Sequence, residues 1–287
     1  MYRFSGHETF HCKEQWLIKG LQLIEIQIDK GKINEEIEIQ ELGVGKNMVK
    51  SIQHWLRAFG WINEENQISK LASIIYKNDP HLENDNSSWL LQYSLCNENY
   101  ASIFRIILHD YFSDKVTNEF SETSLVNYIT RKLQKDKSKP VAENTLRADI
   151  KVFIKTYLSP KKNIKTVEDD FNAPLLPLGL ILDTQRKNSF NEPILKINKL
   201  DHKSISPDLF VYFILDSFPT ETVINLDSIR KKLGSYLCLS IDGIENLITT
   251  ICNINKDFVF KDDAGIKQLQ VKSTKSKFEF ISQIYAH

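Results

Sequence analysis

Residues 42–60 read LGVGKNMVKSIQHWLRAFG, and this stretch sets the expectation for the fold of the whole chain. Gly43 and Gly45 interrupt a helical pattern that ends near residue 42, and glycine readily turns a chain sharply between two helices. A second helix is predicted over residues 46–59, because its apolar residues recur at helical spacing. These apolar residues are Val49, Ile52, Trp55, Leu56 and Phe59.

The opposite face of this predicted helix is polar and basic, with no acidic residue between Leu42 and Gly60. The residues of this face that we expect to bind DNA are Lys46, Asn47, Lys50, Ser51, His54 and Arg57. After the helix, residues 61–68 alternate in a way that is typical of a small β-hairpin. Helix, tight turn, basic helix and hairpin form the layout of a winged helix-turn-helix, whose second helix lies in the DNA major groove. The alternative is a winged helix that contacts proteins and whose basic face is only solvated.

The Gly43-Val44-Gly45-Lys46 segment also invites a phosphate-loop interpretation. That motif needs a glycine five residues before Gly45, where Gln40 stands, and a serine or threonine after Lys46, where Asn47 stands. Because both positions fail, we expect no nucleotide binding here and interpret the glycines as the elbow between two helices.

Similar pairs of helices recur twice along the chain. Helices are expected over residues 124–134 and 144–158, the second of which starts with an Asn-Thr cap. A further pair is expected over residues 226–233 and 242–252, followed by a hairpin that turns at residues 262–265. The spacing of about 95 residues between these units suggests three related modules.

The predicted fold class is therefore mainly α with small β-hairpins, arranged as winged-helix-turn-helix-like modules in tandem. Residues 1–85 are expected to form an N-terminal DNA-binding module, and residues 86–170 a second, helical and basic helix-turn-helix-like module. Residues 171–287 would form a C-terminal winged-helix-like module. These boundaries are placed where the composition turns polar, near residues 84–86 and 161–170.

The charge of the chain is balanced overall but uneven along its length. The 37 Lys and Arg residues match 37 Asp and Glu residues, so the net charge indicates no particular partner. Between Thr130 and Lys165, however, eleven basic residues face three acidic ones, a local net charge of +8. In this run we expect Arg147, Lys151 and Lys155 to follow a DNA backbone. The alternative is a solvated basic face.

Cysteine usage and hydropathy bear on location. The four cysteines lack C-x-x-C spacing, which argues against a disulfide framework or a zinc ribbon and fits a reducing compartment. No apolar run approaches the ~20 residues that span a bilayer, and no basic start followed by an apolar stretch marks a secretion signal. We therefore expect a cytoplasmic protein without a membrane partner.

Residues 7–11, His-Glu-Thr-Phe-His, match the zinc-protease pattern H-E-x-x-H letter for letter. That chemistry needs both histidines one turn apart on one helix face, with the glutamate beside a metal-bound water. Here Ser5-Gly6 directly precede the match, and the apolar helical pattern of residues 13–28 starts only after it. We therefore predict no metal ligands in this stretch or elsewhere.

Two other interpretations of residues 3–10 stay open, and the first is structural. In this interpretation Phe4 and Phe10 fill the core beside Trp16, and Thr9 caps the helix that follows. The chemistry of the segment would then serve only to hold the fold together.

The second interpretation is functional, with Arg3 contacting DNA and other side chains supplying acid–base groups for strand scission. The candidate catalytic residues are His7, Glu8 and Asp79, with Glu83 and Asp85 as further carboxylates. Phosphodiester hydrolysis usually uses a divalent metal held by carboxylates, so Mg²⁺ or Mn²⁺ is expected if the protein cuts DNA. No other cofactor is indicated, and no nuclease motif is recognisable.

Several stretches taken together resemble one bacterial family. They are RFSGHETF (3–10), WLIKG (16–20), LGVGKNMVKSI (42–52), WLRA (55–58), DPHLE (79–83), WLL (89–91), NTLRADI (144–150) and PLLPLGLI (174–181). This is similar to a family of domains of unknown function encoded in DNA phosphorothioation gene clusters, one branch of which resembles the nickase subunit of the Ssp-type system. The match covers nearly two thirds of the chain and ends near residue 181.

The resemblance implies a DNA-binding component of a DNA phosphorothioate modification and anti-phage defence system. It also implies nicking of double-stranded DNA to allow sulfur insertion. The partners implied are the other phosphorothioation proteins, namely a cysteine desulfurase, an ATPase and a PAPS-reductase-like enzyme. Two alternatives remain, a non-enzymatic transcription regulator of the gene cluster and an adaptor that binds partner proteins.

Overall fold

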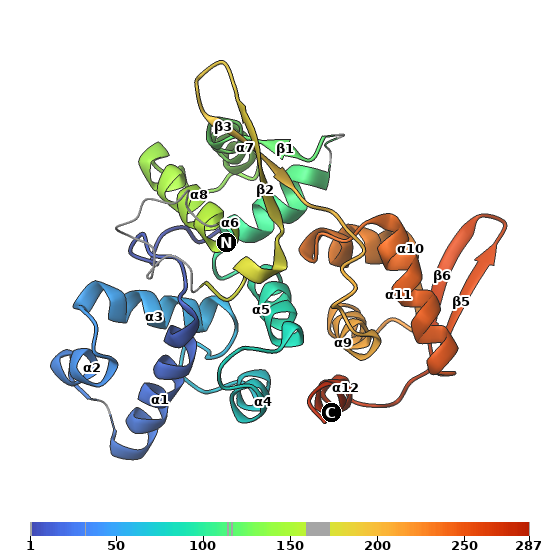
Figure 1. Cartoon of the computed structure of the whole chain (residues 1–287), viewed down its shortest axis with the longest axis horizontal. Helices are drawn as coiled ribbons and strands as arrows, with labels where there is room; N and C mark the ends of the chain where they lie inside the picture. The colour runs from blue at the N-terminus through green and yellow to red at the C-terminus, as the bar shows by residue number, and fades with distance from the viewer. Residues whose placement is uncertain (1, 32, 114, 116, 159–172, 287) are drawn as a thin grey trace.

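The computed structural model of the chain describes residues 2–31, 33–113, 115, 117–158 and 173–286. These residues form a mainly helical structure with two small antiparallel sheets (Figure 1). The predicted class, mainly α with small β-hairpins, is confirmed. Within the described residues, no helix combines the length and the apolar character that crossing a bilayer requires.

The helices of the first half of the chain are α1 (Glu14–Lys30), α2 (Glu35–Leu42), α3 (Lys46–Ala58), α4 (Lys70–Asn78), α5 (Asp85–Asn97) and α6 (Ser102–Arg105), which continues into a π-helical turn (Ile106–Tyr111). Those of the second half are α7 (Glu122–Lys135), α8 (Glu143–Tyr157), α9 (Pro207–Ser217), α10 (Leu226–Ile229), α11 (Ile241–Ile254) and α12 (Lys277–Ile284). A 3-10 turn spans Leu176–Leu178, and a second π-helical turn, Arg230–Gly234, extends α10.

The strands are β1 (Glu119–Phe120), β2 (Ile181–Lys187), β3 (Pro193–Ile197), β4 (Val223–Asn225), β5 (Phe258–Asp263) and β6 (Ile266–Val271). Their order is β1-β3-β2 in one sheet and β4-β6-β5 in the other, and all pairs are antiparallel. In both sheets a single strand precedes a pair of helices and then pairs with the second strand of the following hairpin. The two halves of this arrangement therefore repeat one order of elements, and both hairpins project at the periphery (Figure 1).

The turn between α2 and α3 forms as the sequence predicts. Gly43 ends α2 with a φ of 64°, in the left-handed region that favours glycine, and its N–H donates to the carbonyl of Ile39. Helix α1 then packs against α3 at Gly20, where an added Cβ would lie 2.8 Å from Ile52 and 2.9 Å from Leu56. Only a residue without a side chain allows this close approach of the two helices.

The hairpin predicted at the end of the chain also forms. Asp263 pairs with Ile266, so the connection has two residues, Ala264 and Gly265, with φ angles of 53° and 82°. Positive φ at both central residues is what a tight two-residue hairpin turn requires. The earlier hairpin, by contrast, is reduced to a single antiparallel bridge between Ile62 and Ile68.

Two predicted helix caps are wrong. Helix α1 begins after Lys13, which makes no side-chain cap, and Thr9 lies in the preceding turn with a φ of 65°. Helix α8 begins after Ala142, so Asn144 is already inside the helix. In both cases the chain enters the helix from a direction that tertiary packing determines, and local propensity alone does not predict it.

Helix α5 is the centre of the molecule, and residues 87–96 on it are all buried (Figure 1). The Gln92 side chain connects it to two other parts of the chain. Its amide nitrogen donates to the carbonyl of Tyr236 at 2.6 Å, and its carbonyl oxygen accepts from the Tyr157 hydroxyl at 2.6 Å. The predicted division at residue 85 coincides with the start of α5, and the one near 170 lies outside the described residues. The three-module division itself stays a prediction.

The N-terminal segment, residues 2–12, runs between α3 and α8 and is clasped by Asp149 of α8. The Asp149 carboxylate accepts the N–H of Ser5 at 3.0 and 3.1 Å and lies 3.0 Å from Nε2 of His7. The N–H of Thr9 donates to Nδ1 of His7, which assigns the ring proton to Nε2. From the other side, Ser51 of α3 donates to the carbonyl of His7 at 3.0 Å. We call this set of contacts the Asp149 clasp.

Asp149→Ala is expected to lower the free energy of unfolding by about 3 kcal/mol, because it leaves the buried His7 ring and Ser5 N–H without their acceptor. Urea unfolding at neutral pH measures the change. Lys151→Ala, an exposed residue on the same helix, is the control and is expected to change stability by less than about 0.5 kcal/mol. An equal, small effect of both substitutions would contradict the structural role of the clasp.

Candidate nucleic-acid interface

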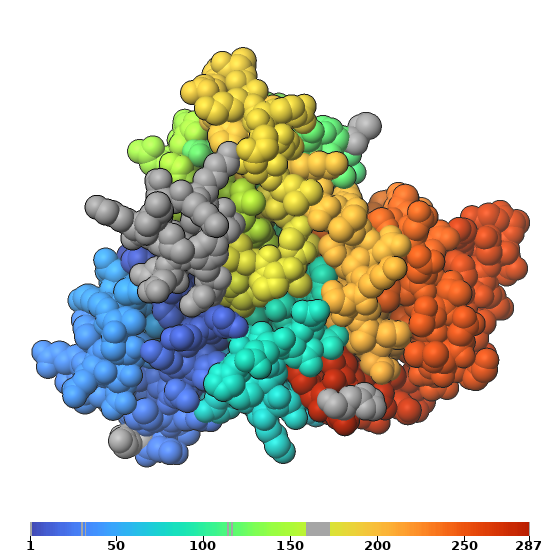
Figure 2. All heavy atoms as spheres, viewed as in Figure 1, coloured from blue at the N-terminus to red at the C-terminus, as the bar shows by residue number. Residues whose placement is uncertain are grey.

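The exposed part of α3 is its N-terminal half. Lys46, Asn47 and Lys50 are exposed, and Figure 2 shows α2 and the start of α3 at one edge of the molecule. No acidic residue lies in the first turn of α3, so the positive end of its helix dipole is not neutralised from within the helix. Lys46 pairs with Glu35 of α2 at 2.8 Å, but both side chains are about half exposed, and such surface pairs contribute little.

The C-terminal half of α3 is largely buried, so two residues of the predicted DNA-binding face are not exposed in this structure. Ser51 and His54 are 0% and 4% exposed, because the N-terminal segment packs over them. Ser51 is used in the Asp149 clasp, and the His54 ring contacts the rings of His7, Trp55 and Tyr100. Arg57 is half-buried and donates to Oδ1 of Asn66 at 2.6 Å.

Burial also changes the acid–base behaviour of His54. It lowers the pKa of this imidazole to about 3, with repulsion from His7 as the next cause. Gly6 approaches the ring so closely that a Cβ there would lie 2.8 Å from Nδ1 of His54, and its φ of 91° is one that glycine adopts without strain. His54 is therefore a neutral core residue that shapes the path of the N-terminal segment.

The structure separates the three candidate catalytic residues by environment. His7 is buried inside the Asp149 clasp, whereas Glu8 is exposed at a φ of 48°. Asp79 is buried and accepts the N–H groups of Glu83 and Asn84 and the hydroxyl of Ser87. Its carboxylate thus organises the turn between α4 and α5. Phe10 packs on Trp16, as the structural interpretation predicts, with ring centroids 6.0 Å apart.

The residues 7–10 form a turn instead of a helix, so His7 and His11 do not share a helix face. Among the described residues, no three His, Cys, Asp or Glu side chains converge in the way that would hold a metal ion. The candidate catalytic residues therefore do not fit a preformed metal site. Mg²⁺ is commonly held by one or two carboxylates together with substrate phosphates, and such a site would be complete only with the substrate bound.

The second predicted basic surface, on α8, is only partly available. Arg147 forms ion pairs at 2.8 Å with Glu122 and with Glu143, and these hydrogen bonds raise the pKa of its guanidinium. Lys151 and Lys155 are exposed. The basic residues of the run at positions 161, 162 and 165 lie outside the described residues.

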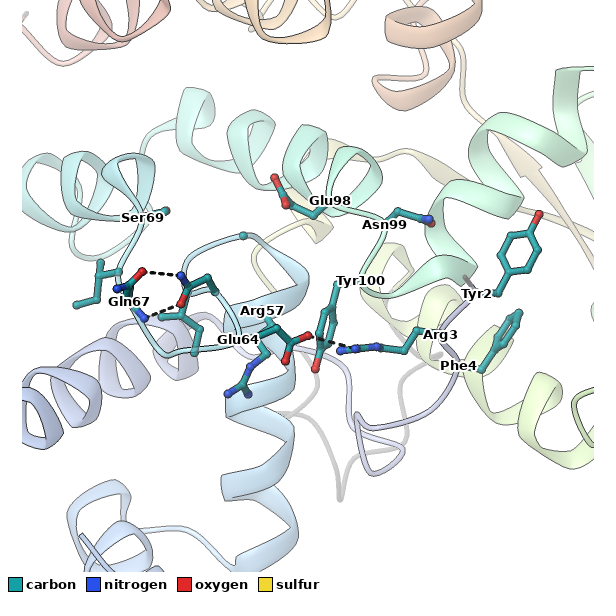
Figure 3. Close-up of a pocket in the computed structure, with 14 residues that line it drawn as sticks. Tyr2, Arg3, Phe4, Arg57, Glu64, Gln67, Ser69, Glu98, Asn99 and Tyr100 are labelled. Carbon is teal, nitrogen blue, oxygen red and sulfur yellow. Dashed lines mark hydrogen bonds and ion pairs between the residues drawn. The ribbon is translucent and has the colours of Figure 1, made fainter. Parts of the chain in front are cut away.

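A groove that sequence reasoning did not find lies between the N-terminal segment and the end of α3 (Figure 3). Its cavity volume is about 850 Å³. The lining residues are Tyr2, Arg3, Phe4, Arg57, Gly60, Ile62, Asn63, Glu64, Gln67, Ile68, Ser69, Glu98, Asn99 and Tyr100. The loop that supplies Asn99 and Tyr100 follows α5 and carries no periodic or motif signal, so only the tertiary structure brings it to Arg3.

Comparisons with known proteins place the chain in a family and a fold. A family model described as "Protein of unknown function (DUF4007)" matches residues 4–285. Two solved structures are similar, a magnesium ion-bound SspB and an SspB, with TM-scores of 0.81 and 0.76 at 19% and 20% identity. Each comparison covers 99% of this chain, and 88% and 87% of the respective SspB chain. No curated protein matches the sequence.

The depressed pKa of His54 predicts a specific pH dependence. An unfolded histidine titrates near 6.5, so the contribution of His54 is fully present above that pH and is lost as the pH falls toward 3. Between pH 7 and pH 5 it should account for about 2 kcal/mol of lost stability. Urea unfolding of the wild type and of His54→Phe at both pH values measures this difference. The same pH slope in both proteins would show that the site does not hold a neutral histidine.

Proposed function

The chain belongs to the DUF4007 family, and from that premise we propose that it is a DNA-binding component of a DNA phosphorothioate modification and anti-phage defence system. The observation that carries DNA binding is the exposed start of α3, directly after the Gly43–Gly45 elbow, with Lys46, Asn47 and Lys50 facing solvent. Lysine and asparagine at this place suit phosphate oxygens and the edge of adenine, respectively. The likeness to SspB supports the pathway.

We further infer that the three parts of the chain are winged-helix-like modules. Residues 119–197 and residues 223–271 each contain a strand, two helices and a hairpin in the same order, with the single strand beside the hairpin's second strand. The hairpin of the first of these units lies beyond the predicted boundary at residue 170. In the first part, α1, α2 and α3 precede the short bridge between Ile62 and Ile68, and α4 follows it. This is the element order of a winged helix, and in the first part α3 is the helix that would enter the major groove.

The proposed partners are double-stranded DNA and the other phosphorothioation proteins, a cysteine desulfurase, an ATPase and a PAPS-reductase-like enzyme, in the cytoplasm. The pathway proposal also includes nicking of the DNA. One similar SspB structure is described as magnesium ion-bound, which supports Mg²⁺ as the ion to test. Of His7, Glu8 and Asp79, Glu8 is the one whose side chain is exposed, and the further carboxylates Glu83 and Asp85 are exposed as well. His7 and Asp79 would act, if at all, by positioning the segments that carry them.

A second candidate function is that of an adaptor that binds partner proteins. The observation that favours it is the acidic surface of α2, which lies beside the start of α3. Its exposed or half-exposed glutamates are Glu35, Glu36, Glu38 and Glu41. These carboxylates would repel a DNA backbone close to α2 and suit a basic protein surface. The transcription regulator remains a third candidate, distinguished by sequence-specific binding without cleavage.

Replacing Lys46 and Lys50 together by alanine is expected to weaken binding of a DNA duplex severalfold and to reduce the slope of log affinity against log salt by about 1 to 2. Fluorescence anisotropy at several salt concentrations measures both quantities. The matched control is the exposed pair Lys77→Ala/Lys275→Ala, which removes the same charge elsewhere. Equal losses of DNA affinity in the two double variants would contradict the assignment of α3 as the DNA-binding helix.

Supercoiled plasmid incubated with the protein and Mg²⁺ or Mn²⁺ is expected to yield open circles, and a chelator should prevent this. Glu8→Gln should reduce the rate at unchanged DNA affinity if Glu8 acts on the backbone. Gel electrophoresis separates the plasmid forms. If the protein binds one promoter tightly and yields no nicked plasmid at any protein concentration, the nickase proposal is wrong. The transcription regulator then takes its place.

A further inference from the structure

We propose that the groove beside the end of α3 binds a single unpaired nucleotide of a DNA strand whose duplex part lies on the start of α3. This inference rests on the proposed DNA binding and adds a substrate feature to it. The groove and the exposed lysines belong to the same helix, because Arg57 lines the groove at one end of α3 and Lys46 begins the other. A strand that leaves a duplex bound at the start of α3 would therefore have a groove to enter at the other end of the same helix.

The first reason is a planar stacking platform. The guanidinium carbon of Arg3 lies 3.9 Å from the centre of the Tyr100 ring, and the Arg3 side chain remains 47% exposed (Figure 3). A guanidinium that covers one aromatic ring offers its other face to a base, and proteins that bind unpaired strands use such stacking. Tyr2 and Phe4 also line the groove, with ring centroids 6.4 Å apart, and their side chains point to the other side of the N-terminal segment from Arg3 (Figure 3).

The second reason is that this platform is held in place before any ligand binds. The backbone of Arg3 is tied to Ser102 in both directions, through its N–H to Oγ at 2.9 Å and through its carbonyl at 3.1 Å. Tyr100 is supported from behind by the His54 ring at 5.3 Å. The Asp149 clasp also holds Ser5, two residues after Arg3 in the chain. The backbone that carries the Arg3 side chain is therefore rigid, which reduces the entropy cost of binding.

The third reason is the set of polar atoms in the wall. The Asn99 side chain and the Arg57 guanidinium line this wall, and Arg57 also donates to Oδ1 of Asn66 at 2.6 Å. Asn63 and Gln67 add amide groups at the other side of the groove, where Nδ2 of Asn63 donates to Oε1 of Gln67 at 2.8 Å. Amides and a guanidinium around an aromatic platform are suited to the hydrogen-bonding edge of a base, which carries both donors and acceptors.

Charge and size are compatible with a nucleotide. Two guanidiniums, those of Arg3 and Arg57, line the groove together with the carboxyl groups of Glu64 and Glu98, and Arg3 forms an ion pair with Glu64 at 3.2 Å (Figure 3). Burial, with the Asp216 carboxylate as second cause, raises the pKa of Glu98. The volume of about 850 Å³ falls within the roughly 300–1,000 Å³ typical of small-molecule sites.

The test compares two duplexes of equal length by fluorescence anisotropy, one fully paired and one with an unpaired nucleotide at a central gap. The wild type is expected to prefer the gapped duplex on the order of tenfold. Tyr100→Ala and Arg3→Ala should abolish that ratio, Arg3→Lys should lower it because the planar face is lost, and Tyr100→Phe should keep it. The quantity compared between variants is the ratio of the affinities for the gapped and the fully paired duplex, and not the absolute affinity. Lys77→Ala is the control.

The two proposals fail in different ways. If the wild type binds neither duplex, the proposed function is wrong. If it binds both equally, or if Arg3→Ala keeps the preference, only the nucleotide groove is wrong. A 4-thiothymidine at the unpaired position should crosslink to a peptide that contains Arg3 or Tyr100, as read by mass spectrometry. Crosslinks confined to residues 46–50 would overturn the proposal that the groove binds the unpaired nucleotide. The same holds if an acidic peptide by itself displaces the gapped strand.

Discussion

The structure depends on one buried carboxylate, that of Asp149, which holds the N-terminal segment between α3 and α8. A carboxylate removed from water must be fully hydrogen-bonded, and here the N–H of Ser5 and the ring of His7 meet that demand. The segment in turn covers the C-terminal half of α3 and positions Arg3 beside Tyr100. The first residues of the chain are therefore part of the core, and they shape both proposed DNA-binding surfaces.

The two halves of α3 consequently have different roles. Its first turns project from the molecule, whereas from Ser51 onward it is packed against α1 on one side and the N-terminal segment on the other. A helix anchored in this way presents its exposed end at a fixed angle, which suits recognition of a rigid duplex. The cost is a small contact surface, so binding by α3 alone would be weak.

Sequence reasoning succeeded where the information is local. The elbow at Gly43, the bounds of α3 and the tight turn at Ala264-Gly265 follow from backbone preferences and apolar periodicity within a few residues. It failed at the caps of α1 and α8, and it placed Ser51 and His54 on an exposed face. Polar side chains were predicted there to face solvent. Instead, Ser51 is buried through its hydrogen bond to the carbonyl of His7, and His54 is buried through its ring contact with His7.

The sequence by itself determined the helical class, the turn–helix element that starts at Gly43, the basic residues at the start of α3 and the family resemblance, because each depends on neighbours along the chain. Only the tertiary structure decided that His7 is buried against Asp149 and that Arg3 stacks on Tyr100, 97 positions away, to line a groove. The physical reason is that burial and pairing depend on which segments meet in space. That meeting is set by packing of the whole core, which no local pattern encodes.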